Sequence, residues 1–538
     1  MEKDKAQTKK AGARGVPARR MAVEVLVAIE KEGAYATLAL NAAFNRKQLS
    51  ERDRAFVTAL VQGVVRHRME LDQKISGLST KPLEKMPDSL KNILRLGIFQ
   101  IEYMDDMPAS AIVDTSTELA KIVGHQGQGR FVNGVLRSYL RLREKAAKKS
   151  PAPSTTDHAE GTDTADSASN ATDDPEPGST DQGSLSTRNN SENNDSTDGE
   201  KPGSATADAT KDGTDIQSLS IKYSIPEWLV KRWMDNYGGE EAIKLLEFAQ
   251  SKPELVIRVC EMSITVEGYE QVLKNKKIEF HHSKLVPSCL IIDSKKQGSP
   301  EKLPGFAEGL FSVQDESAAL VSRVVDAKPG KELIIDLCAA PGGKSLHMAE
   351  MMENTGRVVA VDKHESRLNL LRENRQRLGL TNIEIVAGDG RTFALEKLAD
   401  KVLLDAPCTG TGVINRRSDL RYRRDPLDIA SLTELQRELL SNAAKLVKPG
   451  GILVYATCSI EPEENFDNIR WFMREHADFE GDDLSGFLPE QFRDQLSSCW
   501  TGPACKTEAE MTTPYMLQLL PSRHGVSGFF LCRLRKKL

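Results

Sequence analysis

Two cysteines stand where the sequence could support covalent chemistry. Cys408 follows the apolar run KVLLDAP, and Cys458 follows GILVYAT. Such runs predict buried strands, and if the two strands are neighbours in a sheet, both thiols could face one substrate. Cysteine is the side chain with appreciable thiolate near pH 7, so either sulfur could act as a nucleophile. The residues alone leave open which of them attacks.

The other cysteines indicate structural roles. Buried free cysteine is ordinarily inert core, and we interpret Cys260, Cys289 and Cys532 in this way. The eight cysteines lie far apart without a C-x-x-C pair, and His281-His282 has no partners at metal-ligand spacing, so we expect reduced thiols and no metal. The eight are Cys260, Cys289, Cys338, Cys408, Cys458, Cys499, Cys505 and Cys532.

A turn rich in small residues joins the run ELIIDLC to a helical pattern. It reads Cys338-Ala339-Ala340-Pro341-Gly342-Gly343-Lys344. Small residues let a ligand approach the backbone, and the N–H groups at a helix start attract an anionic group such as a carboxylate. A tight turn without a ligand could use the same glycines, so the turn by itself is weak evidence for a nucleotide-type ligand.

Three acidic residues at predicted strand ends strengthen that interpretation. Asp362 ends RVVAVD, about 20 residues beyond the turn, where a carboxylate can accept hydrogen bonds from ribose hydroxyls. Asp389 follows NIEIVAG, and Asp405 ends KVLLD. Three acids in such places are hard to explain as ordinary surface charge.

The elements that must position these residues alternate from residue 304 onward. Short apolar strands are separated by helical patterns that begin at Gly343 and span 364–379 and 427–447, which predicts repeated βαβ units and a doubly wound parallel sheet over 304–538. MLQLLP and GFFLCRLR predict a closing hairpin. Such sheets bind ligands at the carboxyl ends of their strands, where every residue above should lie.

The earlier part of the chain has a different pattern. Apolar residues within 22–29 recur at i, i+3, i+4 and i+7, Ser50 with Asp53 predicts a capped helix start, and further helices are expected over 88–103, 109–123 and 129–143. We expect an all-α bundle over 16–145. A helix with Pro226 in its first turn, the strands ELVIRVC and SCLIID and a helix near 266–275 predict a small α/β domain over 220–303.

Charge divides the chain more sharply than the formal net charge of −5 suggests. Residues 1–150 hold 27 basic and 17 acidic residues, whereas 151–216 hold 3 basic and 15 acidic residues and no aromatic one. A segment that can bury so little apolar surface predicts a disordered acidic linker, placed at 146–219, and residues 1–15 predict a basic disordered tail. The excess of basic charge in the first part is only weak evidence for nucleic acid.

Length and composition limit the class of protein. A chain of 538 residues predicts about three to four domains. With 39% hydrophobic and 28% charged residues it is neither fibrous nor wholly disordered. No uncharged apolar run reaches the roughly 18 residues of a membrane span, and the N-terminal stretch has no apolar signal region, so a cytoplasmic protein is expected.

Five stretches form a set that is more specific than any one motif. They are FSVQDESAALVSRVV (311–325), CAAPGGK (338–344), DKVLLDAPCTGTG (400–412), YATCSIEPEEN (455–465) and GFFLCRL (528–534). As a set they resemble the NOL1/NOP2/Sun family of S-adenosylmethionine-dependent RNA cytosine-5 methyltransferases, which have a Rossmann-like class I catalytic domain. The helices with ERDRAFVTALVQGVVRH, together with YSIPEWLVKRW, resemble the NusB-like RNA-binding domain and junction of the family's bacterial 16S rRNA members. The acidic tract departs from their usual compact join.

The resemblance implies a role for each matched residue. The turn would hold the methionine end of S-adenosylmethionine, Asp362 its ribose and Asp389 its adenine side, while Asp405 would lie between cofactor and base. Lys344 would lie near the cytosine or beside a strand-end carboxylate. The cofactor-binding residues are then Cys338, Ala339, Ala340, Pro341, Gly342, Gly343, Lys344, Asp362, Asp389 and Asp405.

The reaction that the resemblance implies also accounts for the cysteine pair. Carbon 5 of cytosine is a poor nucleophile, and a thiolate that adds at carbon 6 turns it into an enamine-like centre able to attack a sulfonium methyl group. In DNA cytosine methyltransferases the Pro-Cys cysteine attacks, but in this family the Thr-Cys-Ser cysteine does. We therefore assign Cys458 as nucleophile and Cys408 to product release. Asp405 completes the catalytic set by bonding the protonated ring nitrogen of the flipped base, which requires a raised pKa or a shared proton.

The expected partner is 16S rRNA, free or in an early small-subunit particle, bound by a monomer without a membrane or a metal. The dense arginines after Cys408 are expected to grip RNA phosphates, and a phosphate-binding role for the arginines of 129–143 stays open. One alternative is a NusB-like RNA-binding or antitermination factor with a vestigial methyltransferase fold. Another keeps the chemistry but acts on tRNA or 23S rRNA. The arginines after Cys408 are Arg416, Arg417, Arg421, Arg423 and Arg424.

Overall fold

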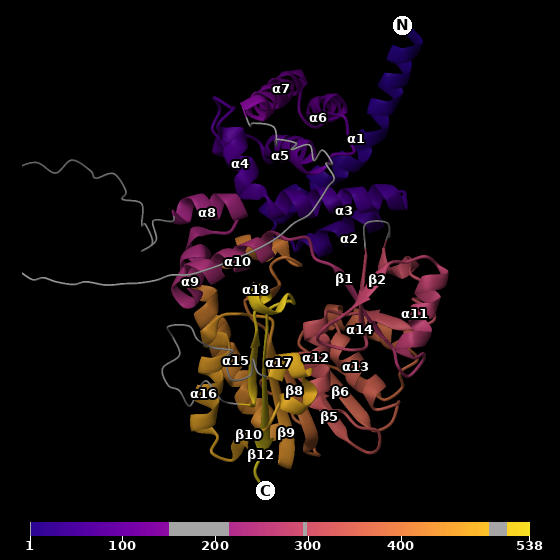
Figure 1. Ribbon diagram of the computed structural model, residues 1–538, viewed down its shortest axis with the longest axis vertical. Coiled ribbons are helices and arrows are strands. Elements are labelled where there is room, and N and C mark those ends of the chain that lie inside the picture. The colour runs from indigo at the N-terminus through magenta and orange to yellow at the C-terminus, as the bar shows by residue number, and fades with distance from the viewer. Residues whose placement is uncertain (1, 150–214, 294–298, 494–513) are drawn as a thin grey trace, which may run out of the picture. The chain divides into compact units, whose positions relative to one another are not determined.

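The computed structural model describes residues 2–149, 215–293, 299–493 and 514–538. Its first part is helical (Figure 1). The helices at 88–103 and 109–123 have the predicted bounds, and Ser50 caps its helix by accepting a hydrogen bond from the Asp53 amide. The elements are α1 (Glu2–Lys31), α2 (Ala36–Arg46), α3 (Glu51–Arg66), α4 (Arg68–Ser76), α5 (Asp88–Tyr103), α6 (Ala109–Val123) and α7 (Gln126–Lys149).

Two predicted disordered segments need correction. The backbone is helical from Glu2, so the expected tail over 1–15 is wrong; Ala, Lys, Glu and Gln are strong helix formers whatever their net charge. The acidic linker was placed at 146–219, but α7 continues to Lys149 and the next helix begins at Ile216, capped by Asp215. Its remainder, 150–214, lies outside the described residues.

Three short helices and a four-stranded sheet follow. The predicted strands and the helix at 266–275 are present, whereas β2 and β4 were not expected; β4 lies beyond the boundary set at residue 303. The sheet order is β2-β3-β1-β4. The elements are α8 (Ile216–Tyr223), α9 (Glu227–Tyr237), α10 (Gly239–Gln250), β1 (Leu255–Val259), α11 (Val266–Asn275), β2 (Phe280–His282), β3 (Cys289–Ile292) and β4 (Phe311–Val313).

The predicted doubly wound sheet forms the C-terminal part. Strands β5 to β9 are parallel, and antiparallel β12 extends the sheet, whose order is β10-β12-β9-β8-β5-β6-β7. The closing pair is β11 with β12. The elements are α12 (Glu316–Val325), β5 (Leu333–Asp336), α13 (Gly343–Met351), β6 (Arg357–Asp362), α14 (Glu365–Arg377), β7 (Ile383–Ala387), β8 (Ala399–Asp405), α15 (Pro426–Leu446), β9 (Val447–Thr457), α16 (Phe466–Glu475), β10 (Phe479–Gly481), α17 (Glu490–Arg493), β11 (Met516–Leu519), α18 (Pro521–His524) and β12 (Phe529–Lys536).

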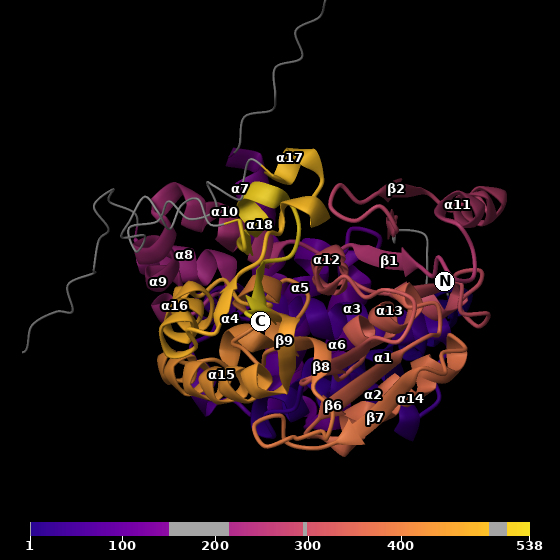
Figure 2. The same cartoon turned by 90° about the horizontal axis from the view of Figure 1, so that it is seen from below.

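Alternation along the strands explains why helices cover both faces. Ile334 packs with α12, α13 and α14, whereas the next residue, Ile335, packs with α15 and α16. Successive side chains of a strand point to opposite faces, so a strand that is apolar throughout requires a cover on each. Figure 2 shows α15 and α16 on one side of β8 and β9, with α12 and α13 on the other. The carboxyl ends of the strands remain as the ligand edge.

Among the described residues, no helix combines the length and apolar character needed to cross a bilayer.

Candidate active site

The two cysteines lie together at the carboxyl ends of adjacent strands. Strands β8 and β9 pair in parallel, with Asp405 opposite Ala456. Cys408 and Cys458 follow these positions by three and two residues, and their Sγ atoms are 3.3 Å apart. The prediction that the two strands are neighbours, which would let both thiols face one substrate, is confirmed.

Of the two thiols, Cys458 is the one that more readily loses its proton. Its pKa is lowered, first by the hydrogen bond with Cys408 and then by the positive charges of Arg417 and Lys344, which together outweigh burial. The same hydrogen bond, with burial, raises the pKa of Cys408 well above its ordinary value. The arrangement therefore favours a thiolate at Cys458 beside a neutral thiol at Cys408, which suits a nucleophile at position 458.

Lys344 lies beside a strand-end carboxylate, one of the two positions expected for it. Its Nζ donates to Oδ2 of Asp405 at 2.6 Å and lies 5.4 Å from the ring centre of Phe529. Burial would lower the pKa of Lys344, but the charge of Asp405 and the hydrogen bond to it raise that pKa above its usual value. The Asp405 carboxylate is thus held next to the Lys344 ammonium group at the end of β8, three residues before Cys408.

The small-residue turn is shaped by close packing. Gly342 has φ +109°, and a Cβ on it would lie 2.1 Å from Cδ1 of Leu371. No larger residue fits there, so the glycine itself is required. The Ala340 amide donates to Oδ2 of Asp362 at 3.1 Å, which ties the turn to the end of β6. Helix α13 starts at Gly343, directly after Gly342, so its first-turn N–H groups face the strand ends.

The remaining predicted acids stand at the neighbouring strand ends. Asp362 is buried and also accepts a hydrogen bond from the His364 amide at 2.9 Å. Asp389, two residues beyond β7, pairs with Arg391 at 2.7 Å, and the side-chain and backbone hydrogen bonds of Arg391 lower the pKa of Asp389. The turn, the three acids and both cysteines therefore share one edge of the sheet.

A fourth acid was missed by sequence reasoning. Asp336 ends β5 and is fully buried; Ser345 donates to its Oδ2 at 2.6 Å, while its Oδ1 has no hydrogen-bond partner among the described residues. Burial raises the pKa of Asp336 to about 7. Its place at a strand end, directly before the small-residue turn, was the available signal.

The arginines after Cys408 mostly hold protein rather than face solvent. Arg421 is fully buried and donates to carbonyl oxygens of Arg66, Tyr223, Ser224 and Ala249. Arg416 pairs with Asp315, Arg423 donates to the Gly33 carbonyl, and Arg424 donates to the carbonyls of Cys408 and Thr409. The prediction that this cluster grips phosphates is wrong for Arg421, which is buried with its donors on backbone carbonyls; for the half-exposed Arg416, Arg423 and Arg424 it stays a prediction. Arg417 is exposed, and its charge reaches Cys458.

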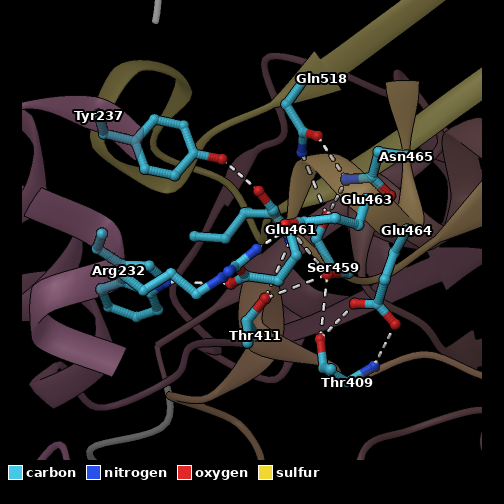
Figure 3. A network of polar contacts seen from close by, with 12 residues as sticks. Arg232, Tyr237, Thr409, Thr411, Ser459, Glu461, Glu463, Glu464, Asn465 and Gln518 are labelled. Atoms are coloured by element: carbon cyan, nitrogen blue, oxygen red, sulfur yellow. Dashed lines mark hydrogen bonds and ion pairs between the residues drawn. The ribbon is translucent and has the colours of Figure 1, made fainter. Parts of the chain in front are cut away.

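A buried polar network fixes the turns that follow both cysteines (Figure 3). Its centre is the segment Ser459–Asn465, which belongs to the motif YATCSIEPEEN; the sequence alone assigned this segment no role. From outside the catalytic domain, α9 reaches the same segment: Arg232 forms ion pairs with Glu461 and Glu463, and Tyr237 donates to the Ile460 carbonyl. Figure 3 shows Arg232 and Tyr237 converging on Glu461 and its neighbours.

Other candidates stay outside the site. Cys260, Cys289 and Cys532 are buried, as predicted, and burial raises the pKa of each. His281 and His282 lie on β2, where His282 approaches Glu270 at 3.3 Å. No group of three or more metal-ligating side chains gathers within the described parts of the chain.

Comparison with known proteins identifies the family. A family model described as 16S rRNA methyltransferase RsmB/F matches residues 324–535, NusB family matches 16–141, and an RsmF/B-like ferredoxin-like domain matches 225–297. The probable ribosomal RNA small subunit methyltransferase B of Bacillus subtilis is 34% identical over 96% of this chain and 98% of its own length. The chain belongs to the ribosomal RNA small subunit methyltransferase B family. The predicted family and fold class are both confirmed.

Three further similarities extend over different lengths. The family member from Synechocystis sp., also named a probable ribosomal RNA small subunit methyltransferase B, is 33% identical over 97% of this chain and all of its own length. The crystal structure of PH0851 superposes with a TM-score of 0.68, 26% identity and 97% coverage of this chain and 98% of its own. A methyltransferase homologue from Pyrococcus horikoshii covers 60% of this chain and 98% of its own, with a TM-score of 0.50 and 30% identity.

Proposed function

We propose that this rRNA methyltransferase transfers a methyl group from S-adenosylmethionine to carbon 5 of one cytosine in 16S rRNA, through a transient bond between Cys458 and carbon 6. The observation that carries the proposal is the pair of sulfurs 3.3 Å apart at the ends of β8 and β9, beside the small-residue turn. A lone buried cysteine would be ordinary core, but two thiols at a ligand edge call for a reaction with two steps.

The donor set of the edge suits the proposed cofactor. The first-turn amides of α13 suit a carboxylate, Asp362 and Asp389 offer acceptors for ribose hydroxyls and an adenine amine, and the small residues of the turn would let a ligand approach its backbone. Asp405 and Lys344 would lie between cofactor and base. When bound, S-adenosylmethionine supplies an electrophilic methyl group on a sulfonium.

The residues of the chain then divide the work. The thiolate of Cys458 adds to carbon 6, and the electron pair released onto the ring makes carbon 5 nucleophilic. The ammonium of Lys344 keeps Asp405 in place, so that the Asp405 carboxyl can contact the ring nitrogen that gains a proton. After methylation the Cys458 sulfur is a thioether and no longer shares a negative charge with Cys408, so Cys408 can ionise and its thiolate takes the carbon 5 proton; the carbon 5–carbon 6 double bond forms again and Cys458 leaves as thiolate.

Replacement of each cysteine separates the two roles. With Cys458→Ala we expect no methyl transfer to 16S rRNA from radiolabelled cofactor, while cofactor binding persists. With Cys408→Ala we expect a covalent protein–RNA adduct, seen as a slow band on a denaturing gel. Appreciable turnover by the first variant would refute the nucleophile assignment, and the adduct band with Cys458→Ala instead would reverse the roles.

Substrate choice needs its own test. We propose that the NusB-like helices over 16–145 hold the RNA, that the small domain over 220–303 joins them to the catalytic part over 304–538, and that the substrate is 16S rRNA rather than tRNA or 23S rRNA. Bisulfite sequencing of all three RNA classes from a strain that lacks the gene should show one lost 5-methylcytosine, in 16S rRNA. Loss of the mark from tRNA or 23S rRNA would move the substrate, and RNA binding without methyl transfer would favour an assembly factor.

A further inference from the structure

The residues that directly follow the two cysteines are joined to each other. Thr409 Oγ1 and Ser459 Oγ are 3.1 Å apart, and both residues are fully buried. Ser459 Oγ also lies 3.2 Å from Thr411 Oγ1 and accepts the Glu461 amide at 3.0 Å. Ser459 therefore connects the turn after β9 to the turn after β8 through two hydroxyl contacts, and the contact with Thr409 lies one residue beyond each sulfur.

A buried carboxylate anchors this contact. One oxygen of Glu464 accepts the Thr409 amide at 2.9 Å and Nε2 of Gln436 at 3.0 Å, and the other accepts the Thr409 hydroxyl. With its hydroxyl proton committed to Glu464, Thr409 can only accept from Ser459. The carboxylate thus fixes the direction of both hydroxyls, and Figure 3 shows the contacts that join Thr409, Ser459 and Glu464.

Burying the Glu464 carboxyl costs free energy, which its hydrogen bonds must offset. Glu464 has no exposed surface, and burial raises the pKa of its carboxyl. Hydrogen bonds from Thr409 and Gln436 offset the burial of this carboxyl, and each donor would cost about 1–3 kcal/mol if it were left unpaired. Apart from Gln436 on α15, the groups that these hydrogen bonds secure within the described residues belong to the turns that carry both sulfurs, which connects the cost to the separation of the thiols.

We propose that Glu464 is a positioning residue: through Thr409 and Ser459 it fixes the two turns that carry Cys408 and Cys458 and so sets the distance between their sulfurs. The proposal deepens the function proposed above, since the two sulfurs are those assigned to bond formation and release. Glu464 does not touch the reacting atoms and acts through the backbone of its neighbours.

Thr409→Val isolates the link. Valine keeps the shape and the backbone amide that binds Glu464, but removes the hydroxyl that joins Glu464 to Ser459. Thr409→Ser restores that hydroxyl, and Glu464→Gln removes the charge and one acceptor while keeping the length. Thr433→Val is the matched control, because the Thr433 hydroxyl is buried on α15 and no residue in the described part of the chain forms a hydrogen bond with it.

A dithiol reagent measures the distance without RNA or cofactor. Phenylarsine oxide condenses with two neighbouring thiols, forming two As–S bonds and releasing one water. The chain used has Cys499→Ser and Cys505→Ser, which confines the readout to the described cysteines, and Cys408→Ala in that chain gives the baseline for a single thiol. We expect Thr409→Val and Glu464→Gln to weaken arsenical binding about three- to tenfold, the loss of about one hydrogen bond, with Thr409→Ser recovering most of it.

Methyl transfer should fall in the same variants that bind the arsenical more weakly. In the two weakened variants kcat should fall by a similar factor with KM for the cofactor unchanged, while Thr433→Val matches the parent in both measurements. Arsenical binding by Thr409→Val and Glu464→Gln equal to that of the parent would overturn the proposal, as would a loss that Thr409→Ser fails to recover. A parent that binds the arsenical tightly but methylates no rRNA would instead defeat the proposed function, leaving the positioning role supported.

Discussion

At the scale of single residues, the hydrogen bond between Cys408 and Cys458 shifts the pKa values of the two thiols in opposite directions. Cys408 supports Cys458 as a thiolate, and its own pKa rises as that of Cys458 falls. Two sulfurs of the same chemical type thereby gain different functions, because Arg417 and Lys344 lie on the side of Cys458.

This sharing predicts a shift in reactivity with pH. In the parent, alkylation of Cys458 by iodoacetamide should rise with a midpoint below that of a free cysteine. With Cys408→Ala the hydrogen bond is lost, the pKa of Cys458 should rise, and the midpoint should move to higher pH. Mass spectrometry of the peptide that contains Cys458 would measure the rate, and an unchanged or lower midpoint would contradict the assignment.

Asp336 predicts a separate effect on stability. Because burial raises its pKa to about 7 in the folded chain, the folded state binds this proton more tightly than the unfolded state, whose pKa is about 4. The stabilisation is complete below about pH 4 and is lost as the pH rises to about 7, on the order of 4 kcal/mol in all.

Melting temperatures of Asp336→Asn and the parent, compared from pH 5 to 8, test this. The parent should lose stability relative to the variant up to about pH 7 and then run parallel to it. A constant difference across the range would show that Asp336 does not carry the proton. Asp400→Asn serves as the control carboxylate, because hydrogen bonds from the Leu333 amide and Lys448 outweigh burial and lower the pKa of Asp400, which keeps it ionised from pH 5 to 8.

At the scale of elements, α9 secures the nucleophile's turn from outside the sheet. Glu461 is fully buried, and its partners Arg232 and Trp233 both come from this helix. The apolar side of α9, with Leu229 and Trp233, is core, which fits the spacing of four residues between them in the sequence. Its polar contacts with Glu461 were not visible in that pattern.

A double-mutant cycle tests the coupling. Arg232→Met leaves the buried carboxylate of Glu461 without its counter-charge and should cost about 3–5 kcal/mol of stability. Adding Glu461→Gln should recover much of that loss, because no charge then remains unpaired. Lys244→Ala, which removes only an exposed pair with Glu240, should change the melting temperature little. Additive effects of the two core substitutions would show that the residues are not coupled.

At the scale of the whole molecule, Arg421 links parts that are far apart in sequence. Its guanidinium donates to carbonyls in α3, around α8 and in α10, and burial lowers its pKa to about 10. The planar fork of arginine reaches several acceptors at once, which a lysine cannot do.

Arg421→Lys should therefore loosen the helical part. We expect a lower melting temperature and faster release of a fragment near residues 16–141 in limited proteolysis, followed by intact mass. Arg372→Lys, at a surface pair with Glu365, is the control. Resistance equal to that of the parent would show that other contacts hold the helical part.

The sequence by itself determined the alternation of strands and helices, the strand-end acids and the pairing of Cys408 with Cys458. These depend on local periodicity and on the rule that parallel strands expose their carboxyl ends together. The tertiary structure alone decided that Arg421 lies inside the protein, that Lys344 pairs with Asp405 and that Glu464 reaches Thr409. The sequence does not show whether a charged side chain contacts water or a buried carbonyl. That depends on which distant segments of the chain pack against it.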